Sequence, residues 1–378
     1  MRLKRMEGRL SEDTSNGCEH ETLIVFLLLQ IVSKNVIKWY DNRMKILQIV
    51  ADGNPGGGTT FVLEMIGSIE NPVLLTQKKS YALEAAGDIP KYGVNFFTTR
   101  FDMRIPLKIR RIINEVKPDL IHVHGGRAAF FLSFVRKKCP IIYTIHGLHG
   151  IYKGVPLSKW AQRKAIKKAD LSVFVSIGEE EVALKNDLIR GANHCVIPNG
   201  IDKLKLPKRQ PAKEKLLAFV GSVTPVKDPL FLLKVMEILG PKGYHLKVIG
   251  GGELEENMKK SSYVTVTGRL PREDALKQLA EAEAVLIPSV WEACALLLLE
   301  AMAMEIPIIA SRISAFEEVV EPGPLATLID RKDPKKYAEA VLAKEDYTQE
   351  AKKRFEEKYL WERCMNSYDS IYREIMRK

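Results

Sequence analysis

Residues 46–58 of the chain read ILQIVADGNPGGG. The first five residues form an apolar block of strand length, and a turn with four glycines follows shortly after them. A helical stretch then begins at Phe61, so the segment predicts the strand, turn and helix that open a parallel α/β sheet. Glycines in such a turn let backbone N–H groups approach a ligand, and the N-terminus of the following helix favours an anion. The segment lacks the full GxGxxG pattern and the lysine of a P-loop, which argues against the standard dinucleotide and P-loop sites.

Short apolar blocks alternate with helical stretches along the rest of the chain. In the first half we expect strands at 46–50, 72–75, 119–123, 141–145, 171–175 and 194–197, and in the second half at 216–220, 245–249, 263–267, 284–287 and 307–310. Strands that alternate with helices form parallel sheets with both faces covered. A stretch rich in Pro and Lys, 203–215, separates the two series and reads as a linker. The predicted fold is therefore α/β, with two doubly wound Rossmann-like domains that face a central cleft.

The pattern divides the chain into an extension at 1–43, domains at 44–205 and 206–355, and a helical, aromatic segment at 356–378. The extension carries an apolar run of only ten residues, 23–32, whereas a membrane-spanning helix needs about 20. We expect Met44 to be the natural start of the protein, or the extension to be loosely attached. An anchor in the membrane interface is the alternative interpretation.

Composition narrows the functional classes. Hydrophobic residues make up 46% of the chain and charged residues 28%, which is typical of a folded protein and argues against disorder. The five cysteines lack metal-ligand spacing, as in a reduced, cytoplasmic protein. The net charge is +11, and residues 44–200 carry most of it, with 22 Lys and Arg against 13 Asp and Glu. This excess favours an anionic partner such as a phosphorylated substrate or acidic lipid headgroups, and no nucleic-acid-binding motif accompanies it.

Three histidines stand at the ends of neighbouring predicted strands. His122 and His124 end one strand, and His146 follows the next. The carboxyl ends of parallel strands meet at one edge, where ligands bind, so we expect these side chains to converge. A metal site is one interpretation, but no carboxylate cluster or HExxH motif supports it. Polar recognition of a hydroxylated substrate fits better.

Two glutamates bracket an almost wholly apolar run in the second half. Glu292 follows a predicted strand, and Glu300 comes eight residues later. Eight residues of helix turn through about 800°, which is not a whole number of turns, so the two glutamates need not share one face of a helix. A helix that begins near Ala295 would instead hold Glu300 inside it and leave Glu292 in the preceding loop. A buried carboxylate needs a partner; for Glu300, sugar hydroxyls, an arginine or water at a helix edge all remain open. Lys227, after the first strand of this half, can meet a phosphate as a point charge.

In combination these residues resemble a known family. The motifs that carry the resemblance are Pro55-Gly56-Gly57, Thr144-Ile145-His146-Gly147, the run VIPNGID at 196–202, Gly221 with Lys227, Gly268, and Pro288-Ser289 with Glu292 and the run EAMA at 300–303. From Met44 onward the chain is similar to a family-four retaining glycosyltransferase of the GT-B fold. The resemblance implies transfer of a sugar, with retention of configuration, from a nucleotide-diphosphate sugar to a hydroxyl acceptor. It also implies an acceptor-side first domain, a donor-binding second domain, and a C-terminal helix at 356–378 that crosses back to the first.

The resemblance assigns roles residue by residue. It implies three catalytic groups: Glu292 contacts the transferred sugar, Lys227 holds the diphosphate, and His146 lies beside the reacting sugar. It implies that Glu300 holds the donor ribose, and that the remaining donor-binding positions are Gly57, Gly58, Ser222, Gly268, Arg269, Leu270, Cys294, Ala295 and Leu296. On the acceptor side we expect His124 and Arg127. Similar enzymes need no metal and no cofactor, and this chain has no DxD sequence.

The chain departs from the family pattern at several positions. Ser222 stands where many relatives carry a phosphate-binding arginine, and Cys294 lies in a run that replaces small and aromatic residues. Glu305 occupies a helix end that usually holds glycine, where a left-handed backbone costs another residue roughly 1 kcal/mol. These departures leave the donor sugar open. They also leave open a sugar-nucleotide epimerase or phosphorylase on a similar scaffold, and a non-catalytic sugar-nucleotide-binding protein.

The acceptor is expected to meet the first domain. Cations and apolar residues mix in 104–117 and 159–168, and Trp160 stands among lysines and arginines. Such a mixture fits a peripheral contact with the anionic inner face of a membrane, and hence a lipid-linked acceptor. The solvent-facing side of a helix is the simpler interpretation. A glycan or small-molecule acceptor also stays open, and nucleic acid is not expected as a partner.

Overall fold

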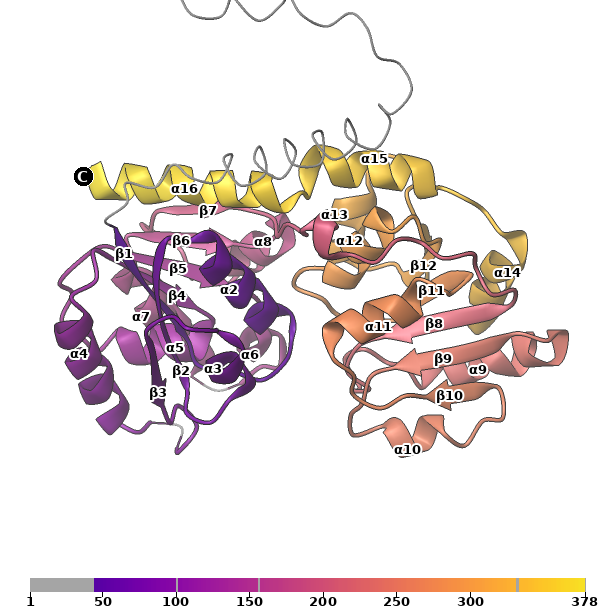
Figure 1. Ribbon diagram of the computed structural model, residues 1–378, viewed down its shortest axis with the longest axis horizontal. Coiled ribbons are helices and arrows are strands. Elements are labelled where there is room, and N and C mark those ends of the chain that lie inside the picture. Colours follow the sequence, from indigo (N-terminus) through magenta and orange to yellow (C-terminus); the bar gives the residue numbers. More distant parts are fainter. Residues whose placement is uncertain (1–43, 100, 156, 331–332, 378) are drawn as a thin grey trace, which may run out of the picture. The chain divides into compact units, whose positions relative to one another are not determined.

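The computed structural model describes residues 44–99, 101–155, 157–330 and 333–377, and the predicted extension at 1–43 lies outside these residues. The described chain forms two parallel sheets in succession, each with helices along it (Figure 1). None of the helices in the described ranges is long and apolar enough to cross a membrane.

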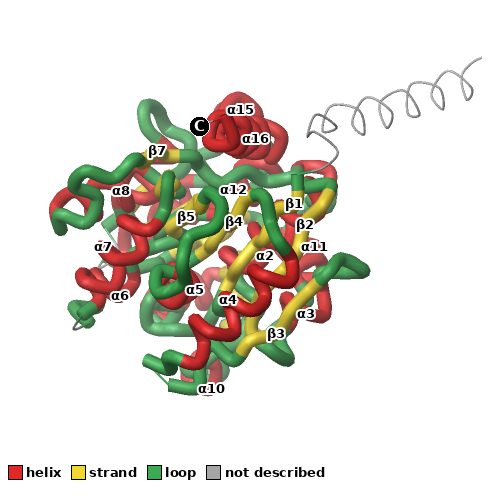
Figure 2. Tube along the Cα trace, turned by 90° about the vertical axis from the view of Figure 1, so that its left-hand side faces the viewer, coloured by secondary structure: helices red, strands yellow, loops and turns green. Residues whose placement is uncertain are grey.

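The first sheet and its helices come from the first half of the described chain. Its strands are β1 (Lys45–Val50), β2 (Asn71–Gln77), β3 (Lys91–Val94), β4 (Leu120–His124), β5 (Ile141–Ile145), β6 (Leu171–Phe174) and β7 (His194–Val196). The helices between them are α2 (Gly57–Ser68), α3 (Tyr81–Ala85), α4 (Arg104–Val116), α5 (Gly126–Leu132), α6 (His149–Tyr152), α7 (Ser158–Lys168) and α8 (Ile177–Lys185). Figure 2 shows these helices beside the strands of the sheet.

The second sheet begins after a short 3-10 turn, η1 (Lys203–Lys205). Its strands are β8 (Leu216–Val220), β9 (His245–Ile249), β10 (Val264–Val266), β11 (Ala284–Ile287), β12 (Ile308–Ser311) and β13 (Thr327–Ile329). The helical elements of this half and of the C-terminal end are α9 (Phe231–Leu239), η2 (Gly240–Lys242), α10 (Glu255–Met258), α11 (Arg272–Leu279), α12 (Leu296–Ala303), α13 (Ser314–Val320), α14 (Pro334–Ala343), α15 (Thr348–Lys358) and α16 (Trp361–Arg377).

Both sheets are doubly wound. The strand order is β3-β2-β1-β4-β5-β6-β7 in the first and β10-β9-β8-β11-β12-β13 in the second, and all the pairs are parallel. The order reverses between β1 and β4 and again between β8 and β11, and ligands of such sheets bind beside these switch points. The prediction of two Rossmann-like α/β domains is confirmed.

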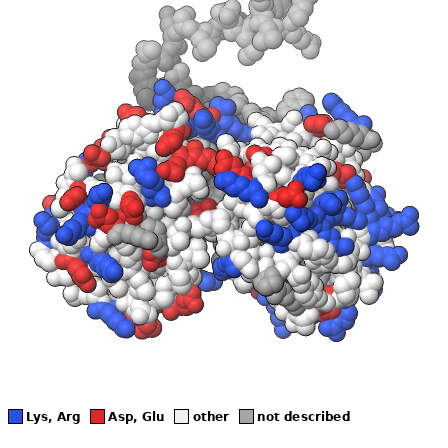
Figure 3. Space-filling view, turned by 180° about the vertical axis from the view of Figure 1, so that it is seen from behind, with Lys and Arg blue, Asp and Glu red and all other residues white. Residues whose placement is uncertain are grey.

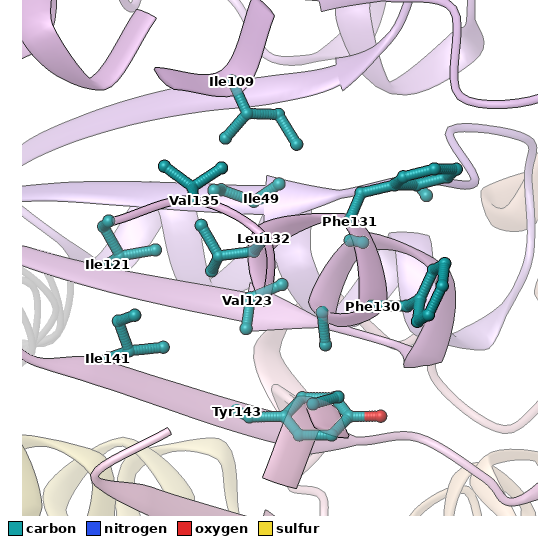
Figure 4. Packing of buried hydrophobic residues seen from close by; sticks show 14 of the residues in the cluster. Ile49, Ile109, Ile121, Val123, Phe130, Phe131, Leu132, Val135, Ile141 and Tyr143 are labelled. Carbon is teal, nitrogen blue, oxygen red and sulfur yellow. The ribbon is translucent and has the colours of Figure 1, made fainter. Parts of the chain in front are cut away.

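Each sheet has an apolar core between its strands and the helices that cover it. In the first half, Phe131 of α5 and Ile109 of α4 belong to the same buried cluster as the strand residues Ile49 and Ile121 (Figure 4). These central strands are buried on both faces, which is why they read as continuous apolar blocks. The cores fix the strand ends, and the strand ends carry the polar residues of the candidate site.

The sequence does not predict two of the strands in the structure. β3 reads KYGV and β13 reads TLI, and each lies at the edge of its sheet. An edge strand has fewer buried positions, so its sequence lacks the continuous apolar run of a central strand. The other strands lie within a residue or two of their predicted positions.

The C-terminal segment is two helices rather than the single helix predicted at 356–378. α15 lies against α12 of the second half and ends at Lys358, and α16 begins at Trp361 and runs along the first sheet (Figure 1). The break between them meets the VIPNGID run, because the N–H of Ile201 donates to Tyr359 O (2.9 Å) and the N–H of Trp361 donates to Ile201 O (3.1 Å). A Cβ at Gly200 would lie 2.8 Å from Leu360 O, so only glycine permits this crossing.

Candidate functional site

The glycine turn after β1 leads straight into a helix. α2 begins at Gly57, four residues earlier than the predicted start at Phe61. Gly57 faces the other half of the chain, since a Cβ there would lie 2.9 Å from Cδ1 of Leu296 at the start of α12. A Cβ at Gly58 would lie 3.8 Å from the ring of His146. The two predicted glycines therefore adjoin two other predicted site residues.

The three histidines converge at the switch point of the first sheet, as predicted. The rings of His122 and His124 have centroids 4.0 Å apart, and the rings of His124 and His146 are stacked at 5.4 Å. Burial lowers the pKa of His122 and His124 well below the ordinary value and lowers the pKa of His146 to about 4. All three rings are therefore neutral near pH 7.

Hydrogen bonds orient the ring of His146. Nε2 of His124 lies 2.7 Å from Oε1 of Gln48, which accepts its proton, so Nδ1 of a neutral His124 has no proton. That Nδ1 lies 3.1 Å from Nε2 of His146 and accepts from it. Nδ1 of His146 is then left as an acceptor, which can receive a hydrogen bond from a hydroxyl group.

Lys227 and Glu292 form an ion pair in the second half. Lys227 lies in the loop after β8, and Glu292 lies in the loop after β11, where the hydroxyl of Ser289 also donates to its Oε1 (2.7 Å). These loops flank the second switch point. The first half lies close by, because a Cβ at Gly147 would lie 3.1 Å from Ala293 Cβ and 3.1 Å from the Trp291 ring.

Glu300 lies inside α12, as predicted, and its partner in the structure is an arginine. Nη2 and Nε of Arg272 donate to Oε1 of Glu300 at 2.6 and 3.1 Å, and Nη1 donates to Oε1 of Glu64 on α2 at 3.2 Å. Burial raises the pKa of Glu300 and of Glu64, and the positive charge of Arg272 opposes both shifts. Of the three partners that the sequence left open for Glu300, the described chain supplies the arginine.

Four further donor-side positions lie in the loops after β8 and β10. Ser222 and Arg269 are exposed, and Leu270 packs against the apolar core of the second half. Gly268 has a φ of 72° and pairs with Gly250 after β9. These positions line the carboxyl edge of β8 and its neighbours, as predicted.

The unusual residues around α12 have structural explanations. Burial raises the pKa of Cys294 to about 12, and hydrogen bonds from the backbone and side chain of Asn199 oppose the shift, so Cys294 is a neutral thiol that contacts the VIPNGID run. Glu305 has a φ of 56°, the left-handed backbone predicted from its position after α12. Its carboxylate pairs with Lys352 and Gln349 of α15.

Arg127 lies at the start of α5, close in sequence to the histidines. Its side chain contacts the loop after β3. Its Nε donates to Phe96 O (2.8 Å), its Nη2 donates to Thr99 O (2.9 Å), and its guanidinium lies 4.5 Å from the ring centre of Phe97. It therefore holds the loop after β3.

Sequence reasoning missed Gln48, Glu64, Ser289 as a partner, and Arg272. Gln48 is a polar residue in an apolar strand, which was a usable signal, because a fully buried amide requires partners. Arg272 and Glu64 are 208 residues apart, and no local pattern joins them. Among the described residues no group of His, Cys, Asp and Glu could hold a metal ion.

Two family models match the chain. The model described as Glycosyltransferase Family 4 matches residues 56–203, and the model described as Glycosyl transferases group 1 matches residues 214–344. Together they span most of the chain. The chain belongs to the group 1 glycosyltransferases. The family suggested by the sequence motifs is therefore confirmed.

Individual relatives of this glycosyltransferase are distant. It is 24% identical over 274 residues to the UDP-Gal:alpha-D-GlcNAc-diphosphoundecaprenol alpha-1,3-galactosyltransferase of Escherichia coli. The aligned region covers 64% of this chain and 70% of that protein. Among solved structures it is similar to the sucrose-phosphate synthase of Thermosynechococcus elongatus, with a TM-score of 0.74, 17% identity and coverage of 89% and 100%. It is also similar to HepE of Anabaena in complex with UDP and glucose, with a TM-score of 0.73, 16% identity and coverage of 87% and 99%. These structures share the GT-B fold.

Proposed function

We propose that this glycosyltransferase moves a hexose-type sugar from a nucleotide-diphosphate sugar to a hydroxyl acceptor and retains the anomeric configuration. The observation that carries the proposal is the arrangement around α12: the Lys227–Glu292 pair precedes the helix, and Glu300 lies inside it. In the proposed complex Glu292 contacts the donor sugar, Lys227 contacts its diphosphate, and Glu300 contacts its ribose. The UDP and glucose bound by the structurally similar HepE support a nucleotide-sugar donor.

The leaving diphosphate would be held by positive groups of the second half. Breaking the anomeric C–O bond leaves negative charge on the diphosphate, and fixed positive groups aimed at that charge lower the barrier. Lys227 supplies one such group. The N-terminus of α12 supplies another, because its N-cap residue, Ala295, has no side-chain acceptor for the free N–H groups of the first turn. The proposed reaction uses no metal and no cofactor.

The transferred sugar would lie between Glu292 and His146. Glu292 is anchored by Lys227 and Ser289, so we propose that its carboxylate binds sugar hydroxyls and does not attack the anomeric carbon. His146 stays neutral and presents Nδ1 as an acceptor, which suits a hydroxyl group rather than a phosphate.

The acceptor is proposed to be lipid-linked. The related galactosyltransferase of Escherichia coli acts, by its name, on a diphosphoundecaprenol-linked sugar. In this chain the loop after β3, the turn before α7 and the first turn of α7 expose large apolar side chains, and we call four of them the acceptor-side surface: Phe97, Phe101, Leu157 and Trp160. The buried ring of Phe130 joins Phe101 and Trp160, with centroids 5.8 and 5.5 Å away. Lysines and arginines gather over the first half in Figure 3, which suits an anionic membrane around such an acceptor.

A thermal-shift screen against UDP-, GDP- and ADP-sugars tests the donor class. We expect the sugar nucleotides of one base to raise the melting temperature of the protein. The best binder should release its nucleoside diphosphate when an acceptor is added. NMR should show that the product retains the anomeric configuration of the donor. Isomerisation of the donor without an acceptor would favour an epimerase. Tight binding without turnover over an acceptor panel would indicate a non-catalytic binding protein.

Changing Glu300 tests the ribose assignment. Glu300→Ala is expected to abolish measurable turnover, and the isosteric Glu300→Gln to weaken nucleoside-diphosphate binding by about 10–100-fold, because each hydrogen bond to a charged group contributes roughly 1.5–3 kcal/mol. Calorimetry measures the affinity, and circular dichroism confirms folding. Glu305→Gln, just beyond the C-terminal end of α12, is the matched control. An unchanged affinity in Glu300→Gln would contradict the assignment.

Changing the acceptor-side surface tests the membrane contact. We expect the protein to float with phosphatidylglycerol vesicles at low salt and to lose most of this binding in Leu157→Ser/Trp160→Ser, since apolar insertion and cationic attraction act together. Lys159→Glu is expected to weaken binding about fivefold or more, from roughly 1 kcal/mol per cation. The exposed Leu204, outside the surface, provides the control variant Leu204→Ser. Flotation that neither change reduces would exclude this surface as the contact.

A further inference from the structure

One arginine is shared by carboxylates from the two halves of the chain. Arg272 opens α11, two residues beyond the predicted base-binding residue Leu270. Its guanidinium contacts Glu300 of α12 and Glu64 of α2. The side chains are 32% exposed for Arg272, 9% for Glu300 and 13% for Glu64, so the charges are largely removed from water. An arginine suits this position because its planar fork can bind two carboxylates at once.

The contacts select one oxygen of Glu300. Both hydrogen bonds from Arg272 go to Oε1, at 2.6 and 3.1 Å. None of the hydrogen bonds that Glu300 accepts within the described residues goes to Oε2. The carboxylate is therefore held in one orientation, with its second oxygen available to a ligand.

The same contacts tie the first half to this carboxylate. Nη1 of Arg272 donates to Oε1 of Glu64 at 3.2 Å. Glu64 lies on α2, whose first residue, Gly57, lies against Leu296 at the start of α12. α2 and α12 thus meet at two places, and one of them depends on Arg272.

We propose that Arg272 is a positioning residue of the donor site: it fixes Oε1 of Glu300 so that Oε2 receives a ribose hydroxyl, and through Glu64 it couples donor binding to α2 of the first half. The inference rests on the proposed function, because it takes the ligand of Glu300 to be the ribose of a nucleoside diphosphate. It adds two residues, Arg272 and Glu64, to the donor site.

Ribose discrimination tests the positioning role. The probes are UDP, GDP or ADP, whichever binds best, and the 2′-deoxy and 3′-deoxy forms of the same nucleotide. We expect the parent protein to bind at least one deoxy form about tenfold or more weakly. Arg272→Met is expected to reduce this preference to threefold or less, and Arg272→Lys to restore part of it. The matched control is Arg163→Met, because Arg163 pairs with Asp187 in the first half, on α7 and away from the donor site.

Hydrogen exchange tests the coupling. Addition of the nucleoside diphosphate is expected to slow amide exchange in both α12 and α2 of the parent. In Glu64→Gln the protection of α12 should persist and that of α2 should fall, while the discrimination between ribose and deoxyribose stays. A parent that prefers no ribose form would contradict the assignment of the ribose to Glu300 and with it this inference, whereas failure of an acceptor to release the nucleoside diphosphate would refute the proposed function itself. A parent that discriminates while Arg272→Met discriminates equally would overturn the positioning role, and unchanged protection of α2 in Glu64→Gln would overturn the coupling.

Discussion

Replacing Lys227 with alanine is expected to lower the turnover number of sugar transfer by about 10²–10³-fold, the usual cost of removing one preorganised charge that stabilises a transition state. The effect should fall on turnover and on the affinity for the nucleoside-diphosphate product, because Lys227 is proposed to meet the leaving group. Steady-state kinetics and calorimetry measure the two quantities. Lys234→Ala, an exposed lysine of α9, controls for the loss of a surface charge.

The ion pair with Glu292 complicates that result, and a double-mutant cycle resolves it. Lys227→Ala leaves the carboxylate of Glu292 without its cation, so some of the loss could come from Glu292 itself. Glu292→Gln should impair transfer and leave diphosphate affinity nearly unchanged, because Glu292 is proposed to contact the sugar. If Lys227 acts on the diphosphate, Lys227→Ala/Glu292→Gln will bind the product more weakly than Glu292→Gln does. Equal affinities in those two variants would reduce Lys227 to a support for Glu292.

The central part of the fold was predictable because its physics is local. β5 reads IIYTI and is buried along its whole length, so its apolar block stands out from the flanking polar residues. The edge strands β3 and β13 offered no such block. The sequence predicts the glycine turn but places the start of α2 too late, because glycine is a poor helix former and Gly57 and Gly58 occupy the first turn.

The site was predictable where one residue type at a strand end restricts the chemistry. His146, Lys227 and Glu292 were found because the carboxyl ends of parallel strands meet at one edge. Their partners were harder to find. Arg272 follows a loop in an ordinary amphipathic helix, and only its tertiary contacts with α2 and α12 give it two carboxylates. Tertiary ion pairs of this kind leave no periodic signal in a sequence.

Gly250→Ala is expected to destabilise the second half more than any other single change discussed for this protein. Gly250 follows β9 with a φ of 146°, a backbone conformation that costs other residues about 1–3 kcal/mol. A Cβ there would also lie 1.9 Å from Gly221 O, so the loops after β8 and β9 would have to separate. We expect a loss of about 3 kcal/mol or more in the free energy of unfolding. The melting temperature should fall by roughly 5–10 °C.

Gly250→Ala is also expected to displace residues of the donor site. This effect on binding distinguishes the change from one that lowers stability alone. Gly250 pairs with Gly268, and the N–H of Gly221 donates to Ile249 O at 3.0 Å, so separated loops would displace the predicted base-binding and phosphate-binding positions together. Nucleoside-diphosphate affinity should therefore fall even at temperatures where Gly250→Ala is fully folded. Gly67→Ala is the matched control, because Gly67 lies in α2 with nothing within 4 Å of an added Cβ, and alanine there should add about 0.5–1 kcal/mol of stability. If Gly250→Ala melted with the parent, the close contact between these loops would not exist in solution.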